Sequence, residues 1–499
     1  GEQVDRIYAE TAGNPLFVVE TVRAGWPSRG DADVLTPRVH AVLQARLQQL
    51  TPGARDLLGL AATAGSSISV DVLGRIGRGE EDALVRDLDE LWRRQLLLSS
   101  GADTYDFSHD KLREVAYGAL SPAQRRRNHR TLARALQEAY AEGPDAVAGR
   151  VAAHLAGAGE AVEASSWYER AAAAAQRVYA DADAAFLLAR ALDLVRSMPS
   201  GRSTSFGCCG PLAAAEGYAS ARLGTVVDRA FDLARQLGVE PAAPLLRAVG
   251  MAVLSRGDVE AALEVGGQLR TRGATDPVSA VEGGFVQGVA AYWRGELAVA
   301  RTHLEAAVAA YRPEDRSAHL LLFGQDPQVL CVARLAHVHF FLGDPAAARR
   351  TRRASLELAR EARHPFTLAV GLLFAALLDL ELREFAALGQ RVGELHGLLD
   401  RVGAPPVRLV SDALAGLLDV VAGRIGPGLA RIDAALADPR RDTAPGVPAM
   451  LLRIRLAACE CTGDAERGLE TAERLLAGDV RVWDAQARRA REVFRAQER

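Results

Sequence analysis

The strongest constraint on this 499-residue chain is a small-residue pattern that recurs along its length. A glycine is followed five positions later by alanine or glycine, and most intervals in the C-terminal half are close to 40 residues. Such a period predicts a solenoid of helical hairpins, because glycine suits the turn and a small residue lets two helices approach closely. The pairs are Gly159/Ala164, Gly257/Ala262, Gly295/Ala300, Gly343/Ala348, Gly423/Gly428 and Gly463/Gly468, with Arg383/Leu388 as a degenerate member.

One copy of this pattern resembles a tetratricopeptide repeat. The intervals exceed the ~34 residues of that repeat, so we expect elongated, degenerate copies. Solenoids bind through a continuous inner surface, which predicts that an inducer or protein partner binds residues 201–499. That copy consists of Gly288, Ala291, Gly295, Ala300, Leu304 and Ala307. Candidates for the inner surface, several of which we expect to be packed in the core, are Gln287, Tyr292, Trp293, Arg294, His337 and His339.

The segment before the repeats reads as a compact winged-helix domain over residues 36–120. Thr36-Pro37 and Thr51-Pro52 are typical helix starts, with a capping residue followed by a proline in the first turn. Two short segments, 96–99 and 104–108, flank Gly101-Ala102-Asp103 and predict a hairpin, the wing. Asp110 is expected to cap the helix that follows.

DNA binding is an alternative use of a winged helix, and the sequence argues against it. The helix before the hairpin carries six acidic residues and one arginine over residues 80–90. Phosphates would repel that face. The net charge of the whole chain is −3, so no basic field directs it to nucleic acid or to an acidic membrane surface.

Two motifs resemble those of the STAND regulators, the signal-transducing ATPases with numerous domains. Residues 106–117, read around Ser108-His109-Asp110, resemble the Met-His-Asp motif of their winged-helix domain. Gly13-Asn14-Pro15-Leu16 resembles the Gly-x-Pro motif that closes the helical part of their ATPase module. Within that family the resemblance extends to bacterial activators of the AfsR and MalT kind and to multidomain nucleotide cyclases.

The resemblance implies roles for particular residues. His109 would contact the β-phosphate of ADP and hold the resting state, while Gly13, Asn14 and Pro15 would lie against the nucleotide, with Pro15 on the adenine. An imidazole can donate to a phosphate oxygen and titrates near neutrality. The structural alternative is that His109 ends a strand and bonds only locally.

The phosphate-binding loop of such an ATPase is absent from this sequence. That loop requires a lysine in a glycine-rich turn, whereas Lys111 is the only lysine in the chain and follows Ser-His-Asp. We therefore expect no catalytic residue and no ATP hydrolysis in this chain. We also expect the chain to be the C-terminal portion of a longer protein, whose upstream core would bind ATP or ADP with Mg²⁺ and hydrolyse ATP slowly.

The remaining composition points to an intracellular protein without a metal site. Five cysteines without regular spacing predict reduced thiols and a cytoplasmic location. His337 and His339 are two positions apart on a helix and so point to different faces, as do Cys459 and Cys461. Neither pair has the spacing that a metal needs on a helix.

Together these observations predict a mostly α-helical protein with four parts. Residues 1–30 would end a STAND ATPase module, 36–120 form the winged helix, 121–200 a helical linker with the first repeat-like hairpins, and 201–499 a tetratricopeptide-like sensor. The predicted function is the regulatory portion of a nucleotide-switched transcription activator, with an ATPase core and effector upstream and ATP-dependent oligomerisation. The alternatives are the regulatory tail of a class III nucleotide cyclase and a plain repeat scaffold.

Overall fold

A computed structural model describes residues 37–65, 67–77, 81–101, 103–178, 181–196, 213, 216–237, 240–274, 276–402 and 404–497. The chain divides into two compact units, one of residues 1–171 with 190–198 and one of residues 172–189 with 199–499. The Gly13-Asn14-Pro15 motif and residues 1–30 lie outside the described residues. The described part is mostly α-helical with one small sheet, which confirms the predicted fold class.

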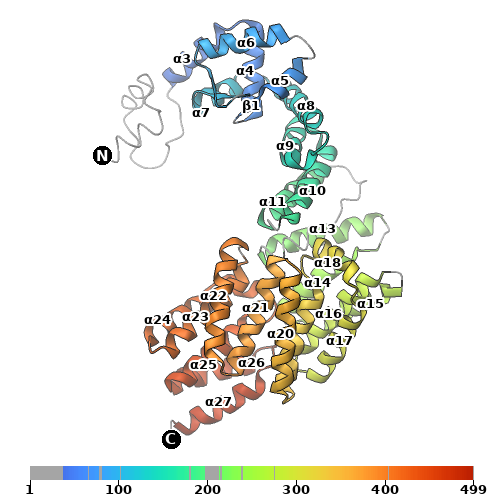
Figure 1. The fold of residues 1–499 in the computed structure, drawn as a ribbon, viewed down its shortest axis with the longest axis vertical. Coiled ribbons are helices and arrows are strands. Elements are labelled where there is room, and N and C mark those ends of the chain that lie inside the picture. The colour runs from blue at the N-terminus through green and yellow to red at the C-terminus, as the bar shows by residue number, and fades with distance from the viewer. Residues whose placement is uncertain are drawn as a thin grey trace. The chain divides into compact units, whose positions relative to one another are not determined.

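The first unit combines helices with a three-stranded antiparallel sheet of order β1-β3-β2 (Figure 1). Leu97 pairs with Phe107 and Ile68 pairs with Tyr105 across the sheet. The hairpin expected between residues 96 and 108 is therefore present, while the winged-helix assignment stays a prediction. The elements are α3 (Pro37–Gln48), α4 (Pro52–Ala64), β1 (Ile68–Ser69), α5 (Val70–Gly77), α6 (Glu81–Arg93), β2 (Leu97–Ser99), β3 (Thr104–Phe107), α7 (Asp110–Gly118), α8 (Pro122–Ala139) and α9 (Ala148–Ala158). Two further helices, α10 (Ala161–Arg177) and α11 (Asp181–Arg196), have residues in both units.

Capping side chains define several helix starts in this unit. Thr51 accepts a hydrogen bond from the Ala54 amide, and Ser121 forms a reciprocal capping box with Gln124. The expected cap at Asp110 is wrong, because the capping position of α7 is His109 and Asp110 is the first helical residue. An aspartate there still favours the helix, since its charge lies at the positive end of the helix dipole.

The second unit is an array of helical hairpins. The first helices of its hairpins are α14 (Ala243–Ser255), α16 (Pro277–Trp293), α19 (Pro327–Phe341), α21 (Pro365–Glu381), α23 (Pro405–Val421) and α25 (Val447–Thr462). Their partners are α15 (Val259–Thr271), α17 (Leu297–Ala310), α20 (Pro345–Glu361), α22 (Phe385–Val402), α24 (Ile425–Ala437) and α26 (Ala465–Ala477). Other helices are α13 (Ala221–Leu237), α18 (Arg316–Phe323) and α27 (Asp484–Gln497).

The turn pattern predicted from the sequence is confirmed at each copy. All six turn glycines have a positive φ, between 70° and 92°, which glycine adopts without steric cost. The degenerate member Arg383 has the same left-handed conformation, with φ 57°. The small residues five positions on are buried between the two helices of each hairpin, as are Ala300 and Ala348, both fully inaccessible.

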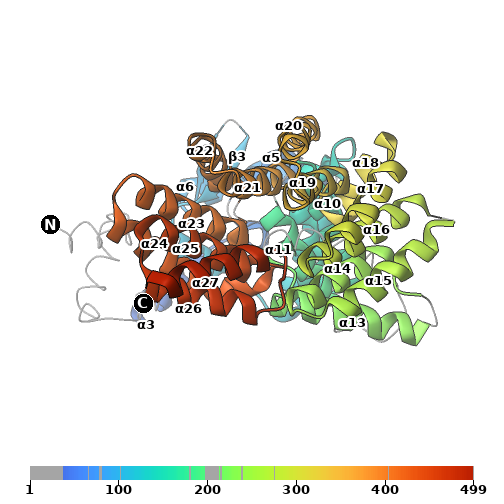
Figure 2. The same ribbon diagram turned by 90° about the horizontal axis from the view of Figure 1, so that it is seen from below.

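The hairpins curve until the two ends of the array meet. First helices form an inner layer and their partners an outer layer (Figure 2). The Ala219 amide donates to the Thr443 carbonyl at 2.9 Å, and the Arg481 amide donates to the Trp293 carbonyl at 2.7 Å. The rings of Trp293 and Trp483 lie 5.9 Å apart. Because residues near both ends of the array are in contact, the inner layer encloses an interior.

Candidate ligand-binding cavity in the repeat array

The enclosed interior is mostly filled by aromatic side chains. Tyr292, Trp293 and His337 are inaccessible or nearly so. The Tyr292 hydroxyl bonds to His337 Nδ1 at 3.1 Å, and His337 Nε2 lies 2.7 Å from the Phe374 carbonyl oxygen. Tyr292, Trp293 and His337 are therefore the candidates that are packed in the core, as was expected for several of the set.

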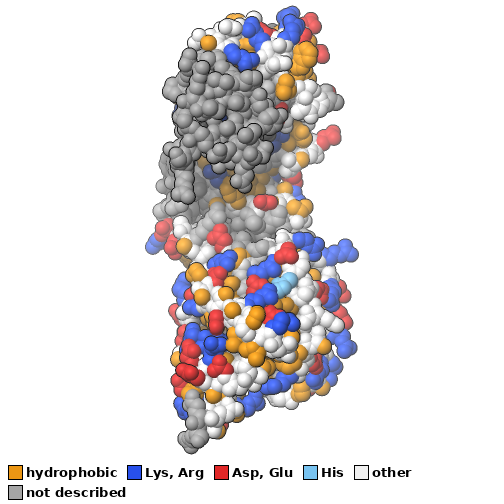
Figure 3. All heavy atoms as spheres, turned by 90° about the vertical axis from the view of Figure 1, so that its left-hand side faces the viewer, with side chains coloured by type: hydrophobic (Ala, Val, Ile, Leu, Met, Phe, Trp, Pro, Cys, Tyr) orange, Lys and Arg blue, Asp and Glu red, His pale blue; other side chains and the backbone are white. Residues whose placement is uncertain are grey.

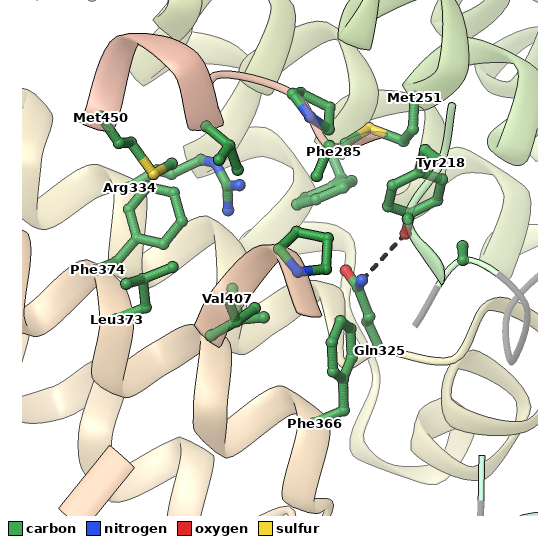
Figure 4. Close-up of a pocket in the computed structure, with 17 residues that line it drawn as sticks. Tyr218, Met251, Phe285, Gln325, Arg334, Phe366, Leu373, Phe374, Val407 and Met450 are labelled. Atoms are coloured by element: carbon green, nitrogen blue, oxygen red, sulfur yellow. Dashed lines mark hydrogen bonds between the residues drawn. The ribbon is translucent and has the colours of Figure 1, made fainter. Parts of the chain in front are cut away.

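A cavity remains beside this aromatic core (Figure 4). Its volume is about 80 Å³, counted as the space open to the centre of a water molecule. One water needs only ~10–15 Å³, so the space is large enough for a group of several heavy atoms. Its wall is apolar over most of its area and includes Met251, Phe285, Phe366, Phe374, Val407 and Met450.

Arg334 is the charged residue of the cavity wall. Its side chain comes from the middle of α19 and is 6% exposed. The guanidinium lies 4.2 Å from the centre of the Phe374 ring and 5.5 Å from that of Phe285, and Figure 4 shows its end directed into the space between them. Nη1 donates to the Leu330 carbonyl at 3.1 Å, whereas Nε is buried and has no hydrogen-bond partner among the described residues.

The positive charge of Arg334 persists in this environment. Burial lowers its pKa to about 10, with the cation of Arg247 adding to the effect and Tyr292 opposing it. At neutral pH the group is therefore still protonated. Among the described residues, no carboxylate forms an ion pair with it.

A buried carboxylate of the inner layer, Glu282, already has partners. Glu282, 1% exposed, accepts from Arg247 Nε at 3.0 Å and lies 2.8 Å from His319 Nδ1. Arg247 in turn lies over the rings of Phe285 and Tyr218. Arg247 is thus paired with a buried carboxylate, whereas Arg334 forms no ion pair with a described carboxylate.

Residues at the starts of two inner helices also line the cavity. Gln325 precedes α19 and donates from Nε2 to the Tyr218 hydroxyl at 3.0 Å, across the space from Arg334 (Figure 4). His364 caps α21 by accepting from the Thr367 amide at 3.1 Å, and Phe366 beside it lines the wall. These helix starts therefore fix the positions of two lining residues.

The other candidates from the sequence have structural partners. Gln287 Nε2 donates to the Leu263 carbonyl, and Arg294 forms ion pairs with Glu260 and Glu296. His339 is half-buried at the C-terminal end of α19. None of these three lines the cavity.

His109 lies in the first unit, between β3 and α7, and is half-buried. Burial lowers its pKa below the ordinary value, the charge of Arg46 adds to that shift, and Asp110 opposes it. The imidazole is therefore mainly neutral at pH 7. Its expected companions Gly13, Asn14 and Pro15 lie outside the described residues, so the structure does not bring this set together.

Sequence reasoning missed Arg334, although a signal was present. The stretch 329–338 of α19 is apolar on every face of the helix except at Arg334 and His337. A lone arginine in a fully buried helix must find a partner or a cavity, because an unpaired buried charge is costly. The pattern identifies the residue, but the cavity depends on helices far apart in the sequence.

The described residues meet the requirements of neither a metal site nor a membrane span. In the ranges that the structure describes, there is no group of three or more histidine, cysteine or acidic side chains that could hold a metal ion. Over those same ranges, no helix combines the length and the apolar character needed to span a bilayer. On the face that Figure 3 shows, basic and acidic side chains are interspersed over the array, without a field of one sign.

Comparison with known proteins gives similarity at the level of structure alone. No family model matches the chain, and no curated protein matches it. Three solved structures are similar, with 12%, 11% and 12% identity and TM-scores of 0.48, 0.39 and 0.21. The first is a STAND protein with a tetratricopeptide repeat sensor from Pyrococcus horikoshii, and the match covers 99% of this chain and 72% of that one.

The second structure is a Rap protein complexed with competence and sporulation factor, with 67% of this chain and 96% of that one covered. The third is the tetratricopeptide-repeat domain of P58(IPK), with 74% and 93% covered. Since all three TM-scores lie below 0.5, the function proposed below rests on this chain's own residues.

Proposed function

We propose that the repeat array is the sensor of a nucleotide-switched regulator and that its interior cavity receives the regulating ligand. The observation that carries this proposal is Arg334, a buried cation whose Nε lacks a partner among the described residues and which lines an apolar cavity. Leaving a buried charge unpaired costs several kcal/mol, which a fold kept only for scaffolding has no reason to retain. A ligand that supplies the missing partner would recover that free energy.

The regulated element is the first unit. The motif around His109 supports a contact from this unit to a nucleotide held by an upstream ATPase core, with ADP favouring the resting state. A ligand in the array would shift the equilibrium from the ADP-bound resting state toward the state that releases ADP. The size of the shift is set by the difference in the ligand's affinity for these two states. The output that fits best is transcription activation, and the alternative output is a nucleotide cyclase. Residues 1–499 by themselves would not hydrolyse ATP.

The closed form of the array supplies a physical route for the signal. Contacts such as Trp293 to Trp483 join its two ends, so a ligand that spreads inner helices must strain or break that closure. Close-packed protein interiors generally respond by switching between discrete arrangements instead of deforming smoothly. The cavity is thus placed where a small ligand has the greatest mechanical effect.

The test uses the intact parent protein loaded with a fluorescent ADP analogue and chased with unlabelled nucleotide. Val407→Phe places a ring in the cavity, and we expect it to change the ADP release rate at least severalfold. Val421→Phe is the matched control, because Val421 is on the same helix and 43% exposed. Equal release rates for Val407→Phe, Val421→Phe and wild type would refute a sensor role for the cavity.

A further inference from the structure

The chemistry of the cavity wall defines the class of ligand. The wall is apolar except for the Arg334 guanidinium and, on the opposite side, the Gln325–Tyr218 hydrogen bond. Gln325 Nε2 already donates to the Tyr218 hydroxyl. Arg334 is therefore the lining residue that could form the strongest additional hydrogen bonds to a ligand.

One end of the Arg334 guanidinium is hydrogen-bonded within α19. Nη1 is committed to the Leu330 carbonyl, while Nε has no partner among the described residues. Nε and Nη2 form the edge that matches the two oxygens of a carboxylate, with two parallel charge-assisted hydrogen bonds. The rings of Phe374 and Phe285 lie beside it and the side chain is 6% exposed, so bulk water solvates the cation poorly.

Charge balance limits the ligand to a single negative charge. Arg247 is paired with Glu282, and Arg453 is paired with Glu381 at 2.9 Å, so Arg334 is the one cation of these three without a carboxylate. One added carboxylate neutralises it. A phosphate monoester would bring a second charge with no cation to match it, and burying an unmatched charge is unfavourable.

From these observations we infer that the cavity binds the carboxylate end of an apolar monocarboxylic acid, with the acid group on Arg334 and the apolar body against Phe366, Val407 and Met450. This inference rests on the proposed sensor function and names the ligand class of the same site. Such a carboxylate has two sources, a small free acid or the C-terminus of an apolar peptide, and both present the same group to Arg334.

Calorimetric titration of the full chain tests the inference with two matched probe pairs. Hexanoate is compared with hexan-1-ol, and N-acetyl-Leu-Phe as its free acid is compared with the same peptide as its C-terminal amide. We expect at least one acid to bind tenfold or more tightly than its neutral partner, as is typical for hydrogen bonds to a charged group. The stronger of the two acids identifies the source of the carboxylate.

Two variants test whether Arg334 causes the preference for the acid over its neutral partner. Arg334→Met removes the charge and should abolish the preference for the acid, while Arg334→Lys keeps the charge and should retain part of it. Circular dichroism and thermal unfolding show whether both variants are folded. If Arg334→Met does not fold, the preference for the acid is measured in Arg334→Lys alone.

The inference is overturned if neither acid binds at millimolar concentration, if alcohol or amide binds as tightly as the acid, or if the preference survives in Arg334→Met. None of these results affects the ADP release rates of the Val407 variants in the parent. A wrong ligand class is therefore distinguishable from a wrong sensor function.

Discussion

At the scale of single residues, the ligand-free chain should tolerate the loss of Arg334. Its charge is buried without a carboxylate, and its cation–π contact with Phe374 is worth only ~1–2 kcal/mol. Arg334→Met should therefore leave the free energy of unfolding within about 1 kcal/mol of wild type or raise it. Arg453→Met is the contrast, because it leaves the buried carboxylate of Glu381 unpaired and should cost about 3–5 kcal/mol. Urea denaturation measures both, and a loss at Arg334 as large as that at Arg453 would show that Arg334 is a structural residue.

Buried histidines should make the fold sensitive to acid. Burial lowers the pKa of His154, His337 and His364 to about 4 each, so between pH 4 and 6.5 the folded chain binds fewer protons than the unfolded chain. Their contribution to stability is complete above pH 6.5 and is lost as the pH falls toward 4, by at most ~1.4 kcal/mol per pH unit for each histidine. Replacing His154, whose Nδ1 lies 3.0 Å from His129 Nδ1, with asparagine should flatten the pH dependence of unfolding of the first unit. An unchanged slope in His154→Asn would contradict the assignment.

At the scale of elements, the turn glycines should be required because other residues are strained in their left-handed backbone conformation. Gly343 has φ 92°, and a Cβ there would meet no neighbouring atom, so backbone strain alone decides the effect of Gly343→Ala. We expect a loss of about 1–2 kcal/mol in the free energy of unfolding. Gly393→Ala is the matched control, because Gly393 lies inside α22, also has open space, and should gain about 0.5–1 kcal/mol. A lower melting temperature for Gly343→Ala together with a higher one for Gly393→Ala would support this explanation. A shift of both melting temperatures in the same direction would contradict it.

The elements were also the most predictable part of the structure. Turn glycines and the buried small residues five positions on are local requirements, so the pattern locates the hairpins even where Arg383 replaces glycine. The start of α7 was predicted less well, because Asp110 and His109 both suit a helix start and the chain's path out of β3 decides between them. The cap at Thr51 was predicted from residue type and the proline that follows it.

At the scale of the whole molecule, the cavity could not be predicted. The closure of the array depends on small rotations added over many hairpins, and its contacts join residues as distant as Ala219 and Thr443. A change of a few degrees per repeat would separate those ends and leave an open inner surface, which was the expectation from the sequence. The sequence left open whether Trp293 and Tyr292 lie on the inner surface or in the core. The same closure explains why both lie in the core.

The chain by itself should not bind nucleotide strongly. It lacks a glycine-rich loop with a phosphate-binding lysine, and backbone amides with that lysine supply most contacts to the phosphates. Calorimetric titration with ATP and with ADP in the presence of Mg²⁺ should therefore detect no binding at micromolar concentration. Micromolar affinity for either nucleotide would mean that residues 1–499 contain a complete nucleotide site.

The central claim is that the cavity of the array controls the nucleotide contact made through His109. A double-mutant cycle in the intact parent measures that coupling from the ADP release rates of wild type, Val407→Phe, His109→Ala and the double variant. His109→Ala alone should weaken ADP binding about tenfold or more, because a hydrogen bond to a charged group contributes ~1.5–3 kcal/mol. If the cavity acts through this contact, Val407→Phe should have little further effect once His109 is absent. Strictly additive effects on the ADP release rate would contradict the claim.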